Sequence, residues 1–359
     1  MSTISVNTIT DASGGNTASI NGATPTTDNT MGRNRIINGD MRIDQRNAGA
    51  SVSVTNTNPY TIDRWQAIGQ SSDGVYSVQQ DSSAPVGFNY SAKITITTAD
   101  ASIGATQQYL FRQLIEGYNV ADLNWGTANA KTVTLSFWVR SSVTGTFGAS
   151  IRNAAVNRAY PFTYSISDAD TWEQKTVTIT GDTTGTWEKT TSTGLEVVFS
   201  LGSGADRLDT AGAWVAANRT GVTGQTNLIA TNGATWYITG VQLETGSVAT
   251  SFERRSYGQE LALCQRYFEK VGFGDGSSRY PTLVGYLNAT NQQATVGVSF
   301  VVPKRAIPTI VKGTDSVSNC TTAIDGSSIQ GFRYLITASS AGQFTANFVN
   351  DGVTASSEL

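Results

Sequence analysis

Large apolar residues alternate with polar ones along most of this chain, in the two-residue period of β-strands. In residues 132–140, every second side chain from Val133 to Val139 is large and apolar, and Trp138 lies among the intervening ones. Such a strand has one face in a core and one face outside it. The alternation recurs in residues 195–201, and further short strands follow with Gly, Asn and Asp turns between them. Because no helical pattern intervenes, the sequence predicts an antiparallel jelly-roll sandwich.

One segment has the period of a helix instead. Ser256 and Gln259 have the spacing of a capping box, in which each side chain bonds the backbone N–H of the other residue at a helix start. Apolar residues then follow at spacings of four, three and four: Tyr257, Leu261, Cys264 and Phe268. Leu263 and Tyr267 widen this stripe. We therefore expect a helix that packs against two neighbouring domains, or against the same helix in other subunits.

These patterns divide the chain into four parts and predict an all-β fold with a single helix. The parts are an extended N-terminal arm (1–32), a jelly-roll domain (33–253), a linking helix (254–271) and a small C-terminal β-sandwich (272–359). The arm has too few large apolar residues to offset its ordering entropy, and its alternation suits strand addition to a partner. Strand patterns in the C-terminal part lie at residues 282–287, 294–301, 332–337 and 344–349.

Composition narrows the possible chemistry. The 359 residues include no histidine, which removes the commonest general base and zinc ligand. Charged residues make up 14%, the net charge is −3, and Lys and Arg do not cluster, so nucleic acid is not an expected partner. No apolar run of about 20 residues and no basic, apolar leader occur, so neither export nor membrane insertion is expected.

The two cysteines have different surroundings. Cys264 lies on the apolar side of the predicted helix, where a small buried hydrophobe is expected rather than a catalytic thiol. Cys320 lies in the polar stretch SVSNCTTAIDG, which suits an exposed loop. Folding in a reducing cytoplasm fits both cysteines.

Four segments, in order along the middle two thirds of the chain, are NGDM (38–41), TLSFWVR (134–140), DTWE (170–173) and WYITGVQLE (236–244). Together they resemble the jelly-roll carbohydrate-binding modules found on glycanases. Those modules hold a structural calcium through acidic residues at positions that correspond here to Arg42, Thr239 and Gly240. Because these residues supply no carboxylate, we expect no metal site and no cofactor.

A second resemblance covers nearly the whole chain. It rests on VNTITDASGG (6–15), GRNRIINGDMRIDQR (32–46), YTIDRWQ (60–66), GSVATSFERRSYGQELALCQRYFEK (246–270) and KRAIPTI (304–310). This arrangement is similar to that of bacteriophage tail-fibre and virion appendage proteins. The resemblance implies a non-enzymatic, homotrimeric structural protein of the virion. Its N-terminal arm would join other virion proteins, and its distal β-domains would meet a host cell-surface glycan.

Three tryptophans in loop-like contexts are candidate ligand platforms: Trp125 in NWGTA, Trp187 in GTWEK and Trp214 in GAWVA. Aromatic rings on the loops of a rigid sandwich can stack on sugar faces, with Arg219 and Asp206 as polar neighbours for the hydroxyl groups. The alternative for these rings is packing beneath a loop or into a subunit interface. For the strand tryptophans we expect packing in the core, with Trp138 a candidate for an open sheet surface. They are Trp65, Trp138, Trp172 and Trp236.

No motif predicts catalysis. Asp168, Asp170 and Glu173 are close enough in sequence to suggest a glycosidase pair, but SDADTW is ordinary turn composition in which Asp bonds its own backbone. The sequence therefore favours multivalent host adhesion by a virion fibre. A head or neck decorating fibre with a purely structural role is the alternative. A capsule depolymerase is a third interpretation, which requires an acid and a base in one cleft.

Overall fold

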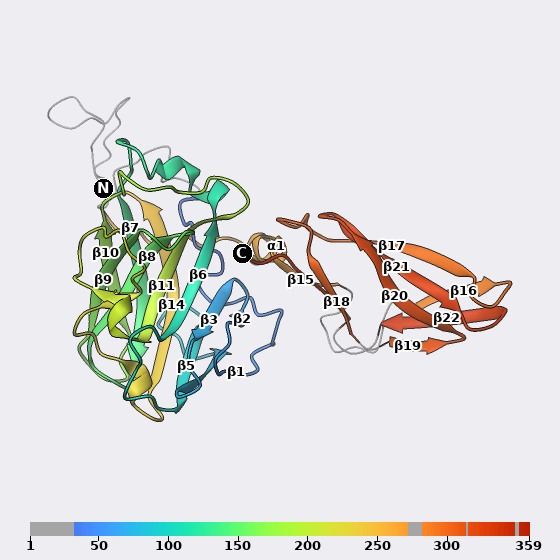
Figure 1. Cartoon of the computed structure of the whole chain (residues 1–359), viewed down its shortest axis with the longest axis horizontal. Coiled ribbons are helices and arrows are strands. Elements are labelled where there is room, and N and C mark those ends of the chain that lie inside the picture. The colour runs from blue at the N-terminus through green and yellow to red at the C-terminus, as the bar shows by residue number, and fades with distance from the viewer. Residues whose placement is uncertain (1–31, 272–281, 314, 349–351) are drawn as a thin grey trace, which may run out of the picture.

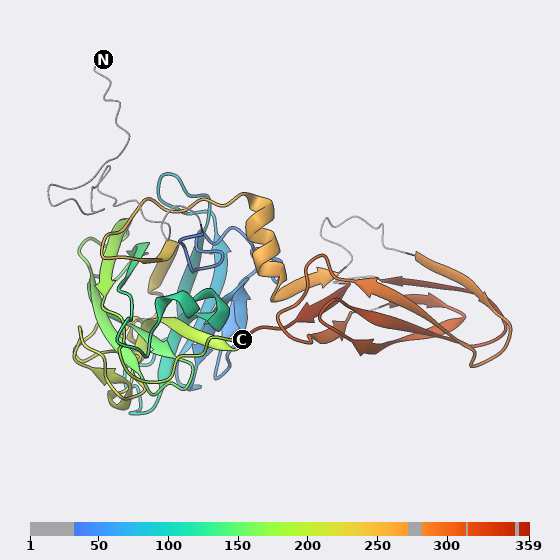
Figure 2. The same ribbon diagram turned by 90° about the horizontal axis from the view of Figure 1, so that it is seen from above.

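The computed structural model describes residues 32–271, 282–313, 315–348 and 352–359, and these residues form mainly β-strands (Figures 1 and 2). The predicted N-terminal arm lies outside the described residues, apart from residue 32. A compact sandwich is followed by α1 and by a second, elongated sandwich that projects to one side (Figure 1). Among the residues described, no helix is long and apolar enough to cross a membrane.

The compact domain consists of two six-stranded sheets. The first sheet has the order β1 (Val52–Val54), β4 (Val75–Asp81), β5 (Ser91–Thr98), β14 (Thr235–Thr245), β7 (Val133–Ser141) and β10 (Glu173–Ile179). The second sheet has the order β2 (Tyr60–Ile62), β3 (Trp65–Gly69), β6 (Gln108–Glu116), β11 (Thr193–Ser203), β8 (Gly145–Asn153) and β9 (Ala159–Ile166). Successive strands cross repeatedly from one sheet to the other, as in a jelly roll. The predicted all-β fold class is confirmed.

Short elements connect these strands. They are the pair β12 (Leu208–Asp209) and β13 (Gly221–Val222) and the 3₁₀ turns η1 (Gly117–Asn119), η2 (Ala121–Leu123), η3 (Ala205–Arg207) and η4 (Leu228–Ala230).

The core lies between the two sheets and follows the predicted alternation. The apolar side chains of β7, from Val133 to Val139, are fully buried. Trp65 and Trp236 are also fully buried, as predicted, and the Trp65 ring stacks on Phe111 with centroids 5.0 Å apart. Trp138, which alternates with the core residues, lies on the opposite face of the first sheet and is half-buried.

The helix is shorter than predicted. α1 spans Tyr257–Gln265 and begins with the predicted capping box of Ser256 and Gln259. Cys264 is buried, as predicted, but Tyr257 is exposed. Residues Phe268–Val271 form strand β15, which pairs with β23 (Val353–Ser356). The predicted helix at 254–271 is therefore too long, because the backbone of its last residues bonds a strand from the other end of the chain.

The C-terminal sandwich contains three small sheets. Their orders are β15-β23-β18 (Thr309–Lys312), β16 (Thr282–Leu287)-β22 (Gly342–Phe348)-β19 (Asp315–Ser318), and β17 (Gln293–Ser299)-β21 (Gly331–Ala338)-β20 (Cys320–Ser327). The four strands expected here from the sequence are present. The interpretation of Cys320 as part of an exposed loop is wrong, because it begins β20 and is buried against the carbonyl of Thr345.

Charged side chains join the two sandwiches. Glu116, at the end of β6, accepts hydrogen bonds from the Arg266 guanidinium at 2.6 and 3.0 Å and from the Tyr267 hydroxyl at 2.7 Å. The guanidinium of Arg64 lies 3.6 Å from the centre of the Tyr267 ring and also pairs with Glu358. The helix and the C-terminal strands are thus attached to the jelly roll by polar groups that are themselves partly or wholly buried.

Candidate ligand-binding surface

The three loop tryptophans meet at one end of the jelly roll. Their rings contact one another edge-on, with centroids 4.7 Å apart for Trp125 and Trp187, 5.3 Å for Trp125 and Trp214, and 5.4 Å for Trp187 and Trp214. Trp125 is only 3% exposed and Trp187 8%, while Trp214 is half-buried and also contacts Tyr160. A buried ring has no face for a sugar, so the geometry favours packing for Trp125 and Trp187.

Arg219 and Asp206 lie next to each other, but in a different group of contacts. Arg219 donates to the Asp206 main-chain carbonyl at 2.7 Å and to the carboxylate of Asp209 at 3.0 Å. Asp206 itself is the middle residue of the η3 turn and is exposed. Their predicted ligand-binding role, like that of Trp214, stays a prediction.

A different set of aromatic rings lies together on the outer face of the first sheet. We call this set the aromatic face: Phe88, Trp138, Trp172, Tyr237 and Phe252, with the cations Lys93, Arg140 and Arg254. Trp138 and Tyr237 face outward because their neighbours along β7 and β14 fill the core. The sequence indicated only Trp138 as a surface candidate, and the expectation that Trp172 packs in the core is wrong, because its ring lies on the outer face against Tyr237 and is half-buried. The outward position of Tyr237 in WYITG was the signal that could have identified a second ring.

Tyr237 forms the floor of this face and is only 8% exposed, so it supports the other rings rather than offering a face of its own. Strand pairing places Lys93 on one side of it and Arg140 on the other. Their charged groups lie 5.7 and 5.0 Å from the centre of its ring, within the range of cation–π attraction. The Trp172 ring meets Tyr237 edge-on at 6.1 Å. Phe88 and Trp172 are half-buried, so parts of both rings are open to solvent.

Gly240 allows two further rings to approach the sheet. It has a left-handed backbone (φ +61°) at an irregularity in the pairing of β14 with β7. A Cβ atom there would lie 2.7 Å from the Phe88 ring and 3.1 Å from the Trp138 ring, closer than such atoms pack. Glycine therefore lets both rings lie directly on the backbone. Phe252 meets Phe88 edge-on at 5.2 Å, and Arg254 lies over both rings.

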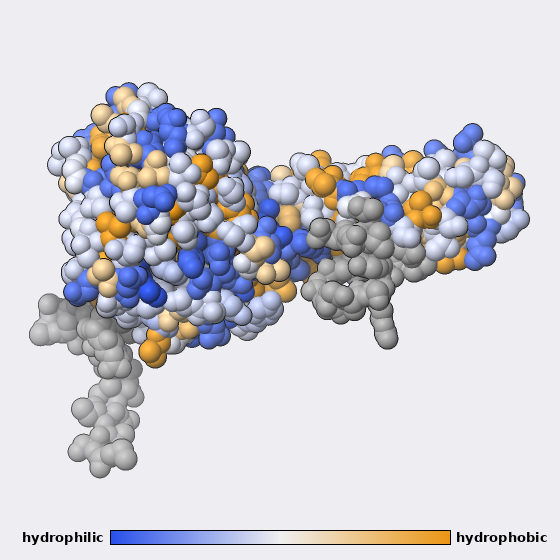
Figure 3. Space-filling model, turned by 90° about the horizontal axis from the view of Figure 1, so that it is seen from below, coloured by the Kyte–Doolittle hydropathy of each residue, from blue (hydrophilic) through white to orange (hydrophobic). Residues whose placement is uncertain are grey.

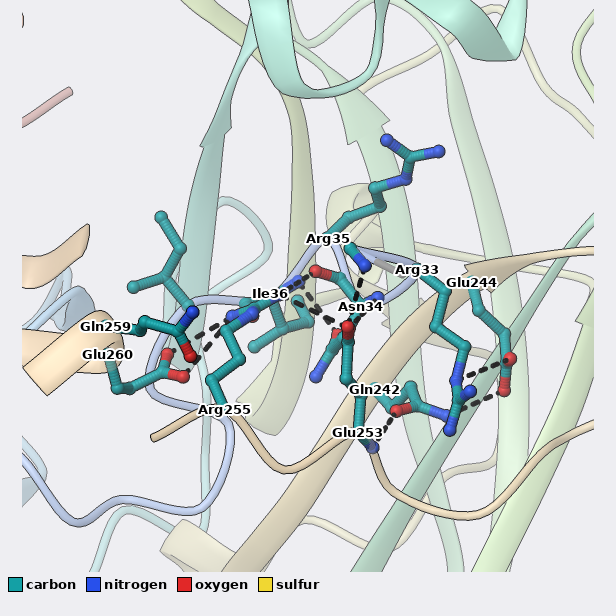
Figure 4. A network of polar contacts seen from close by, with 12 residues as sticks. Arg33, Asn34, Arg35, Ile36, Gln242, Glu244, Glu253, Arg255, Gln259 and Glu260 are labelled. Atoms are coloured by element: carbon teal, nitrogen blue, oxygen red, sulfur yellow. Dashed lines mark hydrogen bonds and ion pairs between the residues drawn. The ribbon is translucent and has the colours of Figure 1, made fainter. Parts of the chain in front are cut away.

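Another part of this outer face is covered by the chain itself. Residues 246–255 run back across it, and Figure 4 shows how they are held. Glu253 accepts from the backbone N–H groups of Gly32 and Asn34 at 2.8 and 2.7 Å, and its own N–H donates to Gln242. Arg255 pairs with Glu253 and with Glu260. The aromatic face stays open, and so does the strip along β10, where the polar residues Gln174, Thr176 and Thr178 are exposed.

The sequence comparison with carbohydrate-binding modules placed Arg42 near a calcium site. In the structure, Arg42 pairs with Asp40 at 3.3 Å and with Glu260 at 3.7 Å. The Arg42 guanidinium therefore neutralises the carboxylates of Asp40 and Glu260 at the position that corresponds to the calcium site of those modules. Within the residues described, no group of three or more His, Cys, Asp or Glu side chains is placed to hold a metal ion.

The outer face of the second sheet is not open either. One oxygen of Glu196 accepts from Arg112 at 2.9 Å and from Arg152 at 2.5 Å, and Arg152 also donates to Asn218. Arg152 and Glu196 are buried beneath the segment that carries β12 and β13. Their mutual pairing fills this part of the face with paired charged groups rather than with rings available to a ligand.

The acidic segment before β10 has the geometry of a turn. Glu173 accepts from the backbone N–H groups of Ser167 and Asp168 and pairs with Lys175 at 2.5 Å. Burial acts to raise the pKa of Glu173, but these hydrogen bonds outweigh it and lower the pKa below its usual value. An ionised carboxylate held in this way is a poor proton donor, which weakens the glycosidase interpretation of these residues.

Comparisons with known proteins add little to this geometry. No family model matches the chain, and no curated protein matches it. Over 59% of its length the chain is similar to the enzymatically active domain of tailspike protein 4 of bacteriophage CBA120, at 14% identity and a TM-score of 0.30, and the match spans 21% of that chain. It is also similar to a CBM4 structure, at 17% identity and a TM-score of 0.29, over 58% of this chain and 98% of the other.

A third similar structure is the family 11 carbohydrate-binding module of a Clostridium thermocellum cellulosomal cellulase. The identity is 12% and the TM-score 0.27, over 55% of this chain and 96% of the module. All three scores are below 0.5, so these similarities carry no argument about what this chain binds.

Proposed function

We propose that this protein is a non-catalytic adhesion component of a bacteriophage virion, a tail fibre or related appendage, that binds a host-surface glycan through the aromatic face. In this proposal the N-terminal arm joins other virion proteins, and several copies of the chain combine weak contacts into useful avidity. The observation that carries the binding role is the group of half-buried rings, Phe88, Trp138, Trp172 and Phe252, on the outer face of the first sheet. Sugars present apolar C–H faces that stack on such rings, and neighbouring cations and amides bond their hydroxyl groups.

The virion assignment has separate support. It rests on the resemblance of the sequence to tail-fibre and appendage proteins, in the segments from residue 6 to residue 310. The low charge content fits a surface that meets hydroxyl-rich polymers by stacking and hydrogen bonding rather than by ion pairing. A capsule depolymerase would need a paired acid and base, and the carboxylates before β10 are engaged in a turn.

Binding to an array of bacterial surface polysaccharides tests the proposal. Trp172→Ala and Trp138→Ala should each weaken binding of a bound glycan by about tenfold, the effect of losing roughly 1.4 kcal/mol of stacking. Tyr118→Ala is the matched control, because Tyr118 is an exposed ring of the jelly roll outside the aromatic face, and it should leave binding unchanged. Thermal unfolding of each variant checks that the fold is kept.

Other outcomes point to the alternatives. If the unmodified protein binds no glycan on the array, the adhesion role is wrong and a structural role, as in a head or neck decorating fibre, is favoured. If it shortens a bound polysaccharide, the protein is a depolymerase. If Trp214→Ala abolishes binding and Trp172→Ala does not, the site lies at the loop tryptophans instead.

A further inference from the structure

The C-terminal sandwich exposes an unusual amount of apolar surface. Seven of the twelve large hydrophobic residues that are exposed in the described chain belong to it: Val284, Tyr286, Val301, Ile307, Val311, Val317 and Ile329. Its own core contains eleven buried residues, of which three are alanines and one is a cysteine. The unit therefore exposes as many large hydrophobic side chains as it buries. In Figure 3, hydrophobic residues lie among hydrophilic and intermediate ones on the visible side of this sandwich. Exposed apolar surface on this scale marks an interaction site.

Strand β16 carries two of these exposed hydrophobic residues on one face. Leu283 and Leu287 point into the core, so the alternate residues Val284 and Tyr286 point outward, and they are 55% and 68% exposed. Strand pairing places Thr345 of β22 opposite Val284, and Ser318 of β19 next in the same row. The described outer face of this sheet thus combines two large apolar side chains with small uncharged ones.

The backbone of β16 is also unpaired on one side. β16 is the first strand of the order β16-β22-β19, and among the described strands only β22 pairs with it. Its sequence, Thr-Leu-Val-Gly-Tyr-Leu, contains no charge and no proline. Natural proteins usually protect a free edge with one of these, because an unprotected edge invites pairing with another chain. The edge therefore offers backbone donors and acceptors beside the exposed apolar face.

The distribution of charged groups in this unit indicates which kind of partner suits the surface. Charged groups of the unit pair with one another away from β16: Lys304 is buried with Glu269, Asp315 accepts from Lys312 and from the Tyr334 hydroxyl, and the exposed Arg333 pairs with Asp325. Among the described residues, the outer face beside β16 presents Val284, Tyr286, Thr345 and Ser318, so a charged partner finds no complementary group among them. A second copy of the same face meets no like-charge repulsion there and can bury apolar surface on both sides.

We propose that copies of this chain associate with one another through β16, by its outer face around Val284 and Tyr286 and by its free edge. The inference concerns self-association and stands apart from glycan binding, which lies on the jelly roll. It identifies the surface that would supply the several copies on which avidity depends.

The oligomeric mass of the full chain tests this inference. Light scattering after size exclusion should give a multiple of the 38.0 kDa chain mass, which falls to 38.0 kDa in the double variant Val284→Lys, Tyr286→Lys. Two lysines on the face introduce repulsion between copies without touching the core. Val86→Lys is the matched control, because Val86 is fully exposed on the jelly roll and should leave the mass unchanged. A chain that is monomeric at every concentration would overturn the proposal.

Crosslinking provides a second test that does not depend on destabilising the assembly. The native cysteines Cys264 and Cys320 are free and buried, so Tyr286→Cys introduces an accessible thiol. Mild oxidation should join chains through this residue, and the same treatment of Val86→Cys should not. An oligomer that survives the double lysine substitution and does not crosslink through residue 286 would place the interface elsewhere. Glycan binding by the jelly roll is measured separately, so either proposal can fail alone.

Discussion

At the level of single residues, the jelly roll buries carboxylates where backbone and side-chain donors reach them. Asp63 is an example. It follows β2, is almost fully buried, and accepts from the backbone and side-chain N–H groups of Gln45 at 3.2 and 2.5 Å. Burial is the dominant influence and raises the pKa of Asp63 to about 6, although Arg46 at 3.9 Å acts in the opposite direction. The carboxylate of Asp63 therefore makes stability depend on pH.

The sign of this dependence can be measured with Asp63→Asn. Because the pKa is higher in the folded protein than the ordinary 3.8, the native state holds the proton more tightly than the unfolded chain. The stability that Asp63 contributes at low pH is therefore lost as the pH rises from about 4 to about 6, by up to roughly 3 kcal/mol. Since Asn does not ionise, urea unfolding should show the variant gaining stability relative to the unmodified protein over this range. A stability difference that does not change with pH would contradict this account.

At the level of elements, α1 shows how a local signal and a distant strand share one segment. The capping box starts the helix at the predicted residue, because Ser256 and Gln259 satisfy backbone N–H groups that no helical carbonyl can reach. The apolar spacing continues to Phe268, but pairing of β15 with β23 ends the helix first. A strand pairing from residues more than eighty positions away leaves no trace in the local period.

Removing the cap tests the first half of this account. Ser256→Ala should lower the free energy of unfolding by about 1 kcal/mol, because it leaves the Gln259 N–H without its acceptor. Ser256→Asp supplies another oxygen at the same position and should recover most of the loss. Denaturant unfolding compares the three proteins, and equal stability of the Ala and unmodified forms would show that the cap does not matter here.

At the level of the whole molecule, the two sandwiches are fastened by ion pairs that are largely shielded from water. Glu358, the penultimate residue of the sequence, pairs with Arg46 at 2.6 Å and with Arg64, which is 1% exposed. Arg305 donates to the main-chain carbonyls of Ser357 and Glu358 and also to that of Thr191 in the jelly roll. The final residues thus lie between the two domains and contact both.

Removing the Glu358 carboxylate from this junction should lower the free energy of unfolding strongly. Glu358→Ala leaves the buried guanidinium of Arg64 without its carboxylate, and loss of one partner of a buried pair typically costs about 3 to 5 kcal/mol. Asp325→Ala is the matched control, because its pair with Arg333 is exposed and should matter by less than about 1 kcal/mol. Calorimetry measures both variants. If Glu358→Ala unfolds like the control, the ion pair does not hold the domains together.

The sequence by itself determined the all-β class, the helix start and most strands, because the alternation of buried and exposed positions and the capping box are properties of neighbouring residues. It also identified Trp65 and Trp236 as core residues, and both lie in the core among other buried apolar residues of their strands. Only the tertiary structure decided which rings gather and which stay open. Tyr237 meets Lys93 and Arg140 through pairing of distant strands, while Trp125 and Trp187 are buried by one another. Which strand edges and sheet faces remain uncovered depends on packing of the entire chain, and local periodicity does not encode it.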